Sequence, residues 1–88
     1  MQAAILAVCS ELLTPLRVDT NSLAITERLN AIGFEVRTKA VVGDDVDELA
    51  ARLSAELDRV DLIVCTGGLG PTEDDVTRDA VARVLARR

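Results

Sequence analysis

The stretch from Leu62 to Asp75 constrains the fold of this chain more than any other. Its first four residues are apolar and β-branched at their centre, which is typical of a buried strand. Three glycines follow within four positions: Gly67, Gly68 and Gly70. A helical pattern of apolar residues then starts at Val76. This order predicts a strand, a tight glycine-rich loop and a helix, and hence an α/β fold.

The glycine loop has two interpretations. Glycine amides without side chains in the way can approach an anion, and the following helix adds unpaired N–H groups and the positive end of its dipole. A phosphate group would suit such a place. The spacing fits neither G-x-G-x-x-G nor G-x-x-x-x-G-K-[ST], and no lysine follows the glycines. The alternative is a strand-to-helix turn that simply needs glycines, and spacing alone leaves both open.

Carboxylates follow the glycines at Glu73, Asp74 and Asp75. Carboxylates next to a bound anion are expected mainly where a divalent cation lies between the carboxylates and the anion. Mg²⁺ can play this part, because it binds carboxylate oxygens and can bridge them to a phosphate. The alternative is that a helix start favours acidic residues. Thr77 is the expected N-cap of this helix, which would place Asp75 between the loop and the cap.

The first third of the chain predicts another strand, loop and helix. Residues 3–9 are apolar almost throughout, as in a strand buried on both faces, whereas residues 10–18 hold no clean period and contain Pro15, as in a loop. Residues 19–22 are four successive capping residues, more than one helix needs, so one or two are available to a site. The helix is expected to end at Gly33. Its expected apolar stripe consists of Leu23, Ile25, Leu29 and Ile32.

The middle of the chain repeats the pattern with an exposed strand. Residues 34–42 alternate between apolar and charged side chains, which predicts an edge strand. One face is expected to carry Phe34, Val36, Thr38, Ala40 and Val42. Asp45 and Glu48 have the spacing of a capping box at the start of a helix over 46–60. Asp44 is left without an obvious structural role.

Right-handed crossovers between these units predict a parallel sheet in the order 34–42, 3–9, 62–65. With helices on both faces, the fold class is a three-layer α/β/α unit. The third strand would then be an edge without any charged residue to protect it, and the last helix has no C-cap before Arg88. We therefore expect the sheet to be a truncated part of a larger one, with the natural protein continuing beyond Arg88.

The size and composition of the chain argue against several classes of function. A chain of 88 residues makes one domain with a thin core. The net charge is −5 and the basic residues are scattered, which argues against nucleic-acid binding. The sequence has no histidine, so it lacks the commonest general base and the commonest zinc ligand.

Two further features bear on location and redox state. Cys9 and Cys65 lack the spacing of a zinc or C-x-x-C motif, so we expect reduced thiols in the core, with thiols at the rim of a pocket as the alternative. The apolar run at residues 3–9 is too short for a signal peptide or a membrane span. A cytoplasmic protein without membrane contact is expected.

Residues 66–78 read T-G-G-L-G-P-T-x-D-D-x-T-R, which resembles the signature loop of CinA-like proteins (competence/damage-inducible protein A). These form a branch of the molybdenum-cofactor-biosynthesis domain family, which also contains MogA, MoaB and the middle domain of MoeA. Residues 10–13, 18–22 and 41–45 resemble further CinA-like blocks at the family spacing. The resemblance spans residues 1–88, which would form about the first half of a MoaB/Mog-type molybdopterin-binding domain.

The resemblance implies a site at the strand ends, where a phosphorylated pterin or adenine nucleotide lies and two aspartates assist metal-dependent chemistry. By position these aspartates are similar to Asp44 and Asp75, which become the expected catalytic and metal-binding residues, with Mg²⁺ as the expected cation. The expected ligand-binding residues are Ser10, Asp19, Thr66, Gly67, Gly68 and Gly70. The resemblance also implies a homo-oligomer for the full-length protein.

Three activities are compatible with this resemblance. The first is metal-dependent hydrolysis of a nucleoside diphosphate such as ADP-ribose. The nearest alternative is transfer of AMP to molybdopterin, as in MogA, and the third is pterin or nucleotide binding without catalysis. The amidohydrolase domain of CinA proteins lies outside the resemblance, so nicotinamide-nucleotide deamidation is not expected.

The sequence departs from the CinA-like pattern at two places near the expected site. Cys9 replaces a usual glycine, and residues 14–17 replace a Leu-Gly-Gln type of turn.

Overall fold

The computed structural model describes residues 1–9, 15–43, 45–67 and 76–86. Strands and helices alternate along these residues, which confirms the predicted α/β fold. Their bounds are β1 (Gln2–Cys9), α1 (Pro15–Ala31), β2 (Glu35–Gly43), α2 (Val46–Leu57), β3 (Leu62–Gly67) and α3 (Val76–Ala86). No helix in these ranges is both long and apolar enough to cross a membrane.

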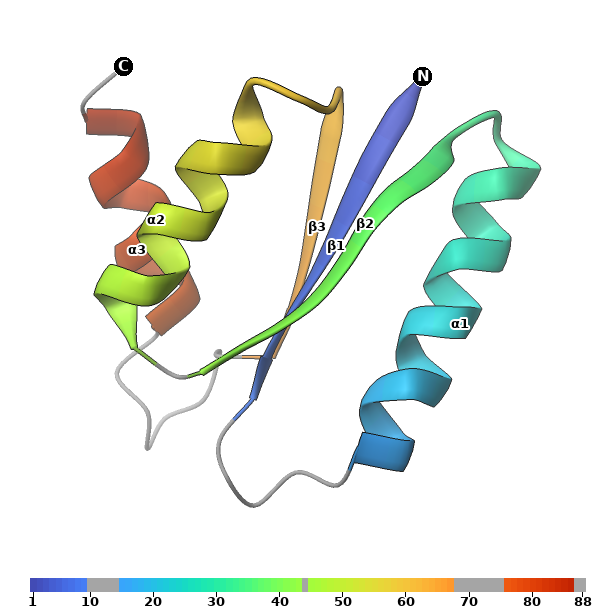
Figure 1. Ribbon diagram of the computed structural model, residues 1–88, viewed down its shortest axis with the longest axis horizontal. Helices are drawn as coiled ribbons and strands as arrows, with labels where there is room; N and C mark the ends of the chain where they lie inside the picture. The colour runs from blue at the N-terminus through green and yellow to red at the C-terminus, as the bar shows by residue number, and fades with distance from the viewer. Residues whose placement is uncertain (10–14, 44, 68–75, 87–88) are drawn as a thin grey trace.

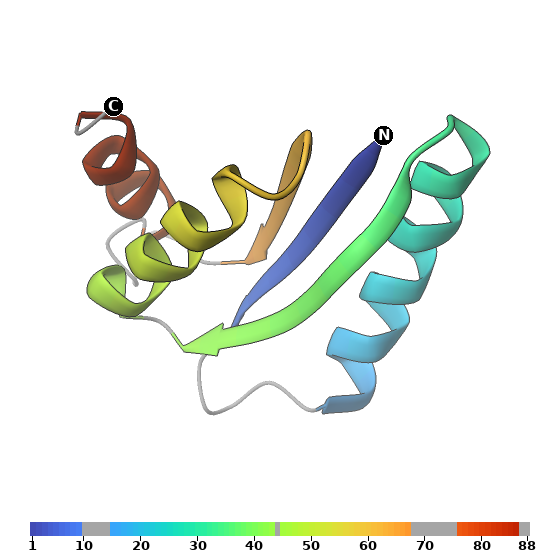
Figure 2. The ribbon, with the colours of Figure 1, turned by 45° about the horizontal axis from the view of Figure 1, so that its top comes forward.

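The three strands form a parallel sheet in the predicted order β2-β1-β3. Helix α1 covers one face of the sheet, and α2 and α3 lie together on the other (Figures 1 and 2). Right-handed crossovers produce this arrangement, because each helix must return the chain to the start of the next parallel strand. The three-layer α/β/α architecture is therefore confirmed.

Two apolar cores lie on the two faces of β1. Leu6 and Val8 pack with the buried residues of α2 and α3, whereas Ala3 and Ile5 pack with Leu29 of α1. All four of these β1 side chains are at most 2% exposed. The central position of β1 explains its almost uninterrupted apolar sequence, because a strand covered by helices on both faces has no solvent side.

The edge position of β2 is confirmed, but the assignment of its apolar residues to one face was wrong. Ala3 pairs with Val36 and Ala4 with Thr38, so Arg37 is an extra residue that forms a β-bulge. The bulge reverses the alternation. Val36, before the bulge, packs toward α1, whereas Thr38 and the later Ala40 and Val42 face α2 and α3.

The expected loop over residues 10–18 was wrong from residue 15 onward, because α1 already begins at Pro15, and residues 10–14 lie outside the described residues. Proline suits the first helical position, where its fixed φ is pre-set for the helix and its missing N–H would have had no partner. Two members of the expected stripe, Leu23 and Ile32, are 55% and 70% exposed. Leu23 lies about 200° around the helix from Ile25, since each residue turns the helix by about 100°. Ile32 follows the last helical residue.

The end of α1 agrees with the prediction. Gly33 has φ +97°, and its N–H donates to the carbonyl oxygen of Asn30 at 3.2 Å. The N–H of Phe34 donates to the carbonyl oxygen of Leu29 at 2.9 Å. This pair of hydrogen bonds is a Schellman motif, which requires a left-handed residue at the position that Gly33 occupies.

Candidate functional site

The carboxyl ends of all three strands meet at one edge of the sheet. Cys9 is in register with Gly43, and Val8 is in register with Gly67, so β1, β2 and β3 end within about one residue of each other. The three strands point toward the same side of the molecule (Figure 1). In open α/β sheets, ligands bind outside the carboxyl ends of the strands. This edge is therefore the candidate site.

Helix α2 begins at this edge with its own carboxylate cap. The side chain of Asp45 accepts hydrogen bonds from the N–H of Asp47 at 2.8 Å and of Glu48 at 3.2 Å. The predicted N-cap is thus confirmed, and such a cap stabilises a helix by about 1 kcal/mol. Because Asp45 supplies it, the neighbouring Asp44 is not needed for that purpose.

Helix α3 begins at Val76, where its apolar pattern starts, and not after Thr77 as an N-cap at that residue would require. Val76 is already helical and Thr77, at 8% exposure, is a buried residue of the first turn, so the expected N-cap role of Thr77 was wrong. The position immediately before the helix belongs to Asp75. The helix is joined to α2 by an ion pair between Arg83 and Asp47, whose side chains are 40% and 83% exposed. An exposed pair of this kind adds about 0 to 1 kcal/mol of stability.

Few of the expected site residues lie in the described part of the chain. Thr66 and Gly67 are the last two residues of β3, at the candidate edge as predicted, and Thr66 is half-buried. The backbone of Asp19 lies inside α1, so its expected place before the helix was wrong. The remaining expected residues lie outside the described residues: Ser10, Asp44, Gly68, Gly70 and Asp75.

Covalent connectivity still places three of these residues directly after strands that end at this edge. Ser10 is bonded to the end of β1, Asp44 to the end of β2, and Gly68 to the end of β3. Within the ranges that the structure describes, no three acidic, cysteine or histidine residues converge as a metal site would require. The assignment of Mg²⁺ to Asp44 and Asp75 stays a prediction.

Cys65 stands one residue before Thr66 and is half-buried as a free thiol. Burial raises the pKa of this thiol, because an apolar environment disfavours the charged thiolate. The neutral thiol is not a nucleophile, since only the thiolate attacks. The expected reduced, structural role of Cys65 is consistent with this environment.

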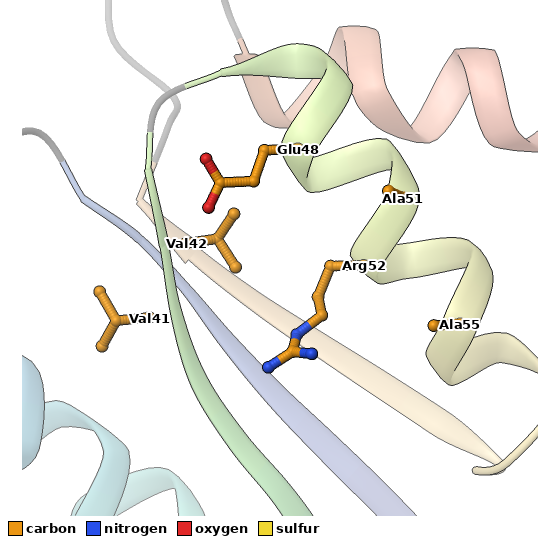
Figure 3. A pocket seen from close by; sticks show the side chains of 6 residues that line it. All are labelled: Val41, Val42, Glu48, Ala51, Arg52 and Ala55. Atoms are coloured by element: carbon orange, nitrogen blue, oxygen red, sulfur yellow. The ribbon is translucent and has the colours of Figure 1, made fainter.

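One pocket near the candidate edge was not predicted from the sequence. It has a volume of about 280 Å³ and lies between the outer edge of β2 and helix α2. Figure 3 shows Val41 and Val42 on opposite sides of β2, with Glu48 and Arg52 reaching from α2 toward the strand. Arg52 is one helical turn from Glu48, and oppositely charged residues at this spacing are also common on solvent-exposed helix surfaces. The sequence therefore could not show that these residues line a pocket and not an ordinary exposed surface.

Gly43, the last residue of β2, lies close to the side chain of Glu48. A Cβ atom at Gly43 would lie 3.3 Å from Oε2 of Glu48, so a side chain there would require this flexible carboxylate to shift by a few tenths of an ångström. The carboxylate lies beside the strand end that leads to Asp44. Glu48 therefore adds negative charge next to the candidate edge.

Comparison with solved structures confirms the fold. The crystal structure of CinA from Thermoplasma acidophilum is 37% identical with a TM-score of 0.87, and the match covers 98% of this chain and 52% of that one. The molybdopterin biosynthesis enzyme MoaB from Thermus thermophilus is 31% identical with a TM-score of 0.75, over 93% of this chain and 53% of that one.

Comparison of sequences gives the same result. A CinA-like protein from Solibacter usitatus is 53% identical over all 88 residues, which is 21% of its own length. The chain thus spans about a fifth of this curated relative and about half of the two solved structures. The family model described as "Probable molybdopterin binding domain" matches residues 4–88. This match covers nearly the whole chain, and the chain belongs to that family of molybdopterin-binding domains.

Proposed function

We propose that this chain forms part of a CinA-like site that hydrolyses the pyrophosphate of a nucleoside diphosphate such as ADP-ribose. The observation that carries the proposal is the common edge at which β1, β2 and β3 end. The segments that hold the expected site residues continue from these three ends. A ligand that spans this edge would therefore meet all of them.

Each group in the proposed site has a separate task. Backbone amides of residues 66–70 bind one phosphate, because a glycine-rich turn before a helix presents N–H groups to an anion. Asp44 and Asp75 hold a divalent cation, which when bound would polarise the pyrophosphate. Water supplies the new P–O bond as the P–O–P bridge breaks, so ADP-ribose would yield AMP and ribose 5-phosphate. Neither the neutral Cys65 thiol nor any histidine is available for a covalent route.

A second candidate is transfer of AMP to molybdopterin, favoured by the similarity to MoaB. It would use the same residues, and the two differ in whether water or a pterin phosphate receives the adenylyl group. A third is ligand binding without turnover. Formation of AMP from ADP-ribose separates the first candidate from the other two. Mg²⁺, homo-oligomerisation and a cytoplasmic location stay predictions.

Thr66→Val tests whether the end of β3 contacts the ligand. The experiment uses a chimera in which these 88 residues replace the matching segment of the Solibacter usitatus CinA-like protein. Valine keeps the shape of threonine and suits a strand, so we expect an unchanged Tm. Loss of a hydroxyl that donates to a phosphate should weaken ADP-ribose binding about tenfold, as titration calorimetry can measure.

Thr38→Val is the matched control on the other edge strand. The Thr38 hydroxyl donates to Oε2 of Glu56 at 3.4 Å, and Glu56 is only 3% exposed. Removing this donor should lower Tm, because a buried carboxylate loses a partner, while the Kd for ADP-ribose stays unchanged. If Thr66→Val instead lowers Tm and leaves the Kd as it was, Thr66 is a structural residue and has no part in the site.

A further inference from the structure

The pocket between the outer edge of β2 and helix α2 has the composition of a small-molecule site. Its apolar walls include Val42, Ala51 and Ala55, and two charged side chains, Glu48 and Arg52, reach from α2 toward the strand (Figure 3). Ligand sites in proteins likewise combine apolar walls with a few polar groups that orient the ligand. The volume of about 280 Å³ is at the lower end of the range for such sites, so the ligand must be small.

The two charged groups of this pocket do not neutralise each other. Glu48 precedes Arg52 by four residues, which is the order and spacing that best favours an ion pair on a helix surface. Within the described part of the chain, neither side chain forms an ion pair or a hydrogen bond. Both charges are therefore available to a ligand.

A purely structural role for Glu48 would be the second half of a capping box, in which its carboxylate accepts a hydrogen bond from the N–H of Asp45. Among the described residues, the box is formed only in its first half, where Asp45 accepts from the N–H groups of Asp47 and Glu48. The Glu48 carboxylate lies instead beside Gly43, at the end of the facing strand. It is thus directed across the pocket and not back to the start of its own helix.

The strand side of the pocket supplies main-chain groups. Val41 lines the pocket although its side chain lies on the opposite side of β2 from that of Val42 (Figure 3). In the described sheet, β2 pairs with β1 only, so its outer edge carries N–H and C=O groups without a strand partner. These groups can accept and donate hydrogen bonds to a ligand that lies along the strand.

The arrangement of charge determines which ligand the pocket can accept. A phosphate or another simple anion would be repelled by Glu48, and a simple cation would be repelled by Arg52, whereas a ligand with both charges satisfies both groups. Asp47 and Glu48 make the first turn of α2 acidic, and Arg52 lies one turn further along the helix. The positive group of the ligand is therefore expected near the end of β2, and its negative group near Arg52.

We propose that this pocket binds a small α-amino acid as a zwitterion. The guanidinium of Arg52 binds the carboxylate, for which its planar fork of N–H donors is suited. The ammonium group binds the carboxylate of Glu48 and donates to open C=O groups of β2. A short apolar side chain packs against Val42, Ala51 and Ala55. The inference does not rest on the proposed hydrolysis, because the phosphates of a nucleoside diphosphate do not match this pair of charges.

Titration calorimetry of the chimera with L-valine tests the proposal. We expect saturable binding with a Kd of about 1 mM or below. Arg52→Gln and Glu48→Gln should each weaken it by at least about tenfold, since each leaves one charge of the ligand without a partner. Glu27→Gln and Arg28→Gln are the matched controls, because these exposed residues lie on α1, across the sheet, and both should leave the Kd unchanged.

Two analogues with a single charge test the orientation of the ligand. N-acetyl-L-valine keeps only the negative charge, so it should bind more tightly to Glu48→Gln than to the unmodified chimera. L-valinamide keeps only the positive charge, so it should bind more tightly to Arg52→Gln. The opposite pattern would mean that the assignment of the two charged ends is wrong.

Three further results would overturn the proposal. The first is no saturable binding of L-valine at ten times the expected Kd. The second is an unchanged Kd in either Arg52→Gln or Glu48→Gln, because the ligand would then not bridge the two charges. The third is displacement of L-valine by a non-hydrolysable methylene analogue of ADP-ribose, because the pocket would then belong to the nucleotide site.

Discussion

Replacing Asp75 with asparagine should reduce Mg²⁺-dependent cleavage of ADP-ribose by at least about 100-fold in the chimera, as expected when a carboxylate of the reaction is lost. Stability should hardly change. Asp75 directly precedes α3, and asparagine caps helices about as well as aspartate. A group that acts in the transition state affects kcat, whereas a capping group affects unfolding. Steady-state kinetics and Tm on the same samples separate the two roles.

Asp74→Asn is the matched control, one residue earlier and equally acidic. The resemblance places the functional aspartate directly before Val76, so Asp74→Asn should keep kcat within a few-fold of the unmodified chimera. If Asp75→Asn turned over ADP-ribose as fast as the unmodified chimera, Asp75 would not be a catalytic residue. Greater sensitivity at Asp74 than at Asp75 would show that the assignment chose the wrong neighbour.

Leu49→Ala should lower the free energy of unfolding by about 2 to 5 kcal/mol, more than any other substitution considered above or below. Leu49 is 0% exposed and lies on α2, where it packs against the core formed with β1 and α3. Removing its branched end leaves a cavity that the rigid sheet cannot close. Since small domains are stable by only about 5 to 15 kcal/mol, this loss should be plain in urea unfolding followed by circular dichroism.

Leu85→Ala is the control for this change, because Leu85 is 61% exposed in the same chain. It should shift the free energy of unfolding by no more than about 0.5 kcal/mol, the usual range for a surface substitution. Equal effects at the two leucines would mean that the interface between α2 and the sheet is not the packed core described above.

Much of the fold follows from local patterns in the sequence. The apolar residues 3–9 and 62–65 could be placed as strands because covered strands of a parallel sheet leave no polar face. The charges of residues 35–39 identified the edge strand, and Gly33 marked the end of a helix because a left-handed residue is needed there. Right-handed crossovers then determined the strand order.

The errors arose where structure depends on a partner far along the chain. The bulge at Arg37 appears only when β2 is aligned with β1, and a strictly alternating sequence gives no sign of it. Pro15 is compatible with both a loop and a first helical turn, and the sequence does not decide between them. Buried Glu56 looks like a solvated residue of α2 until Thr38 of β2 is brought against it.

The meeting of the strand ends at one edge was predictable from the sequence, whereas the geometry of the candidate site was not. The sequence placed its residues after three strand ends, and the structure brings those ends together at Cys9, Gly43 and Gly67. The distances between the two aspartates and the glycine loop depend on segments that follow the strands, and helical or strand periodicity does not determine such segments. The pocket beside Arg52 was missed because a charged helix face looks the same whether or not it lines a pocket.

The proposed function requires a phosphate ligand to bind across the carboxyl ends of the three strands. Amide exchange of the chimera, measured by mass spectrometry, tests it with Mg²⁺ and a non-hydrolysable methylene analogue of ADP-ribose. We predict slower exchange in peptides that contain Cys9, Gly43 and Gly67, with no change at the opposite strand ends near Gln2 and Leu62. Protection confined to those opposite ends, or no protection at a saturating concentration of the analogue, would show that the ligand does not bind at the carboxyl ends of the strands.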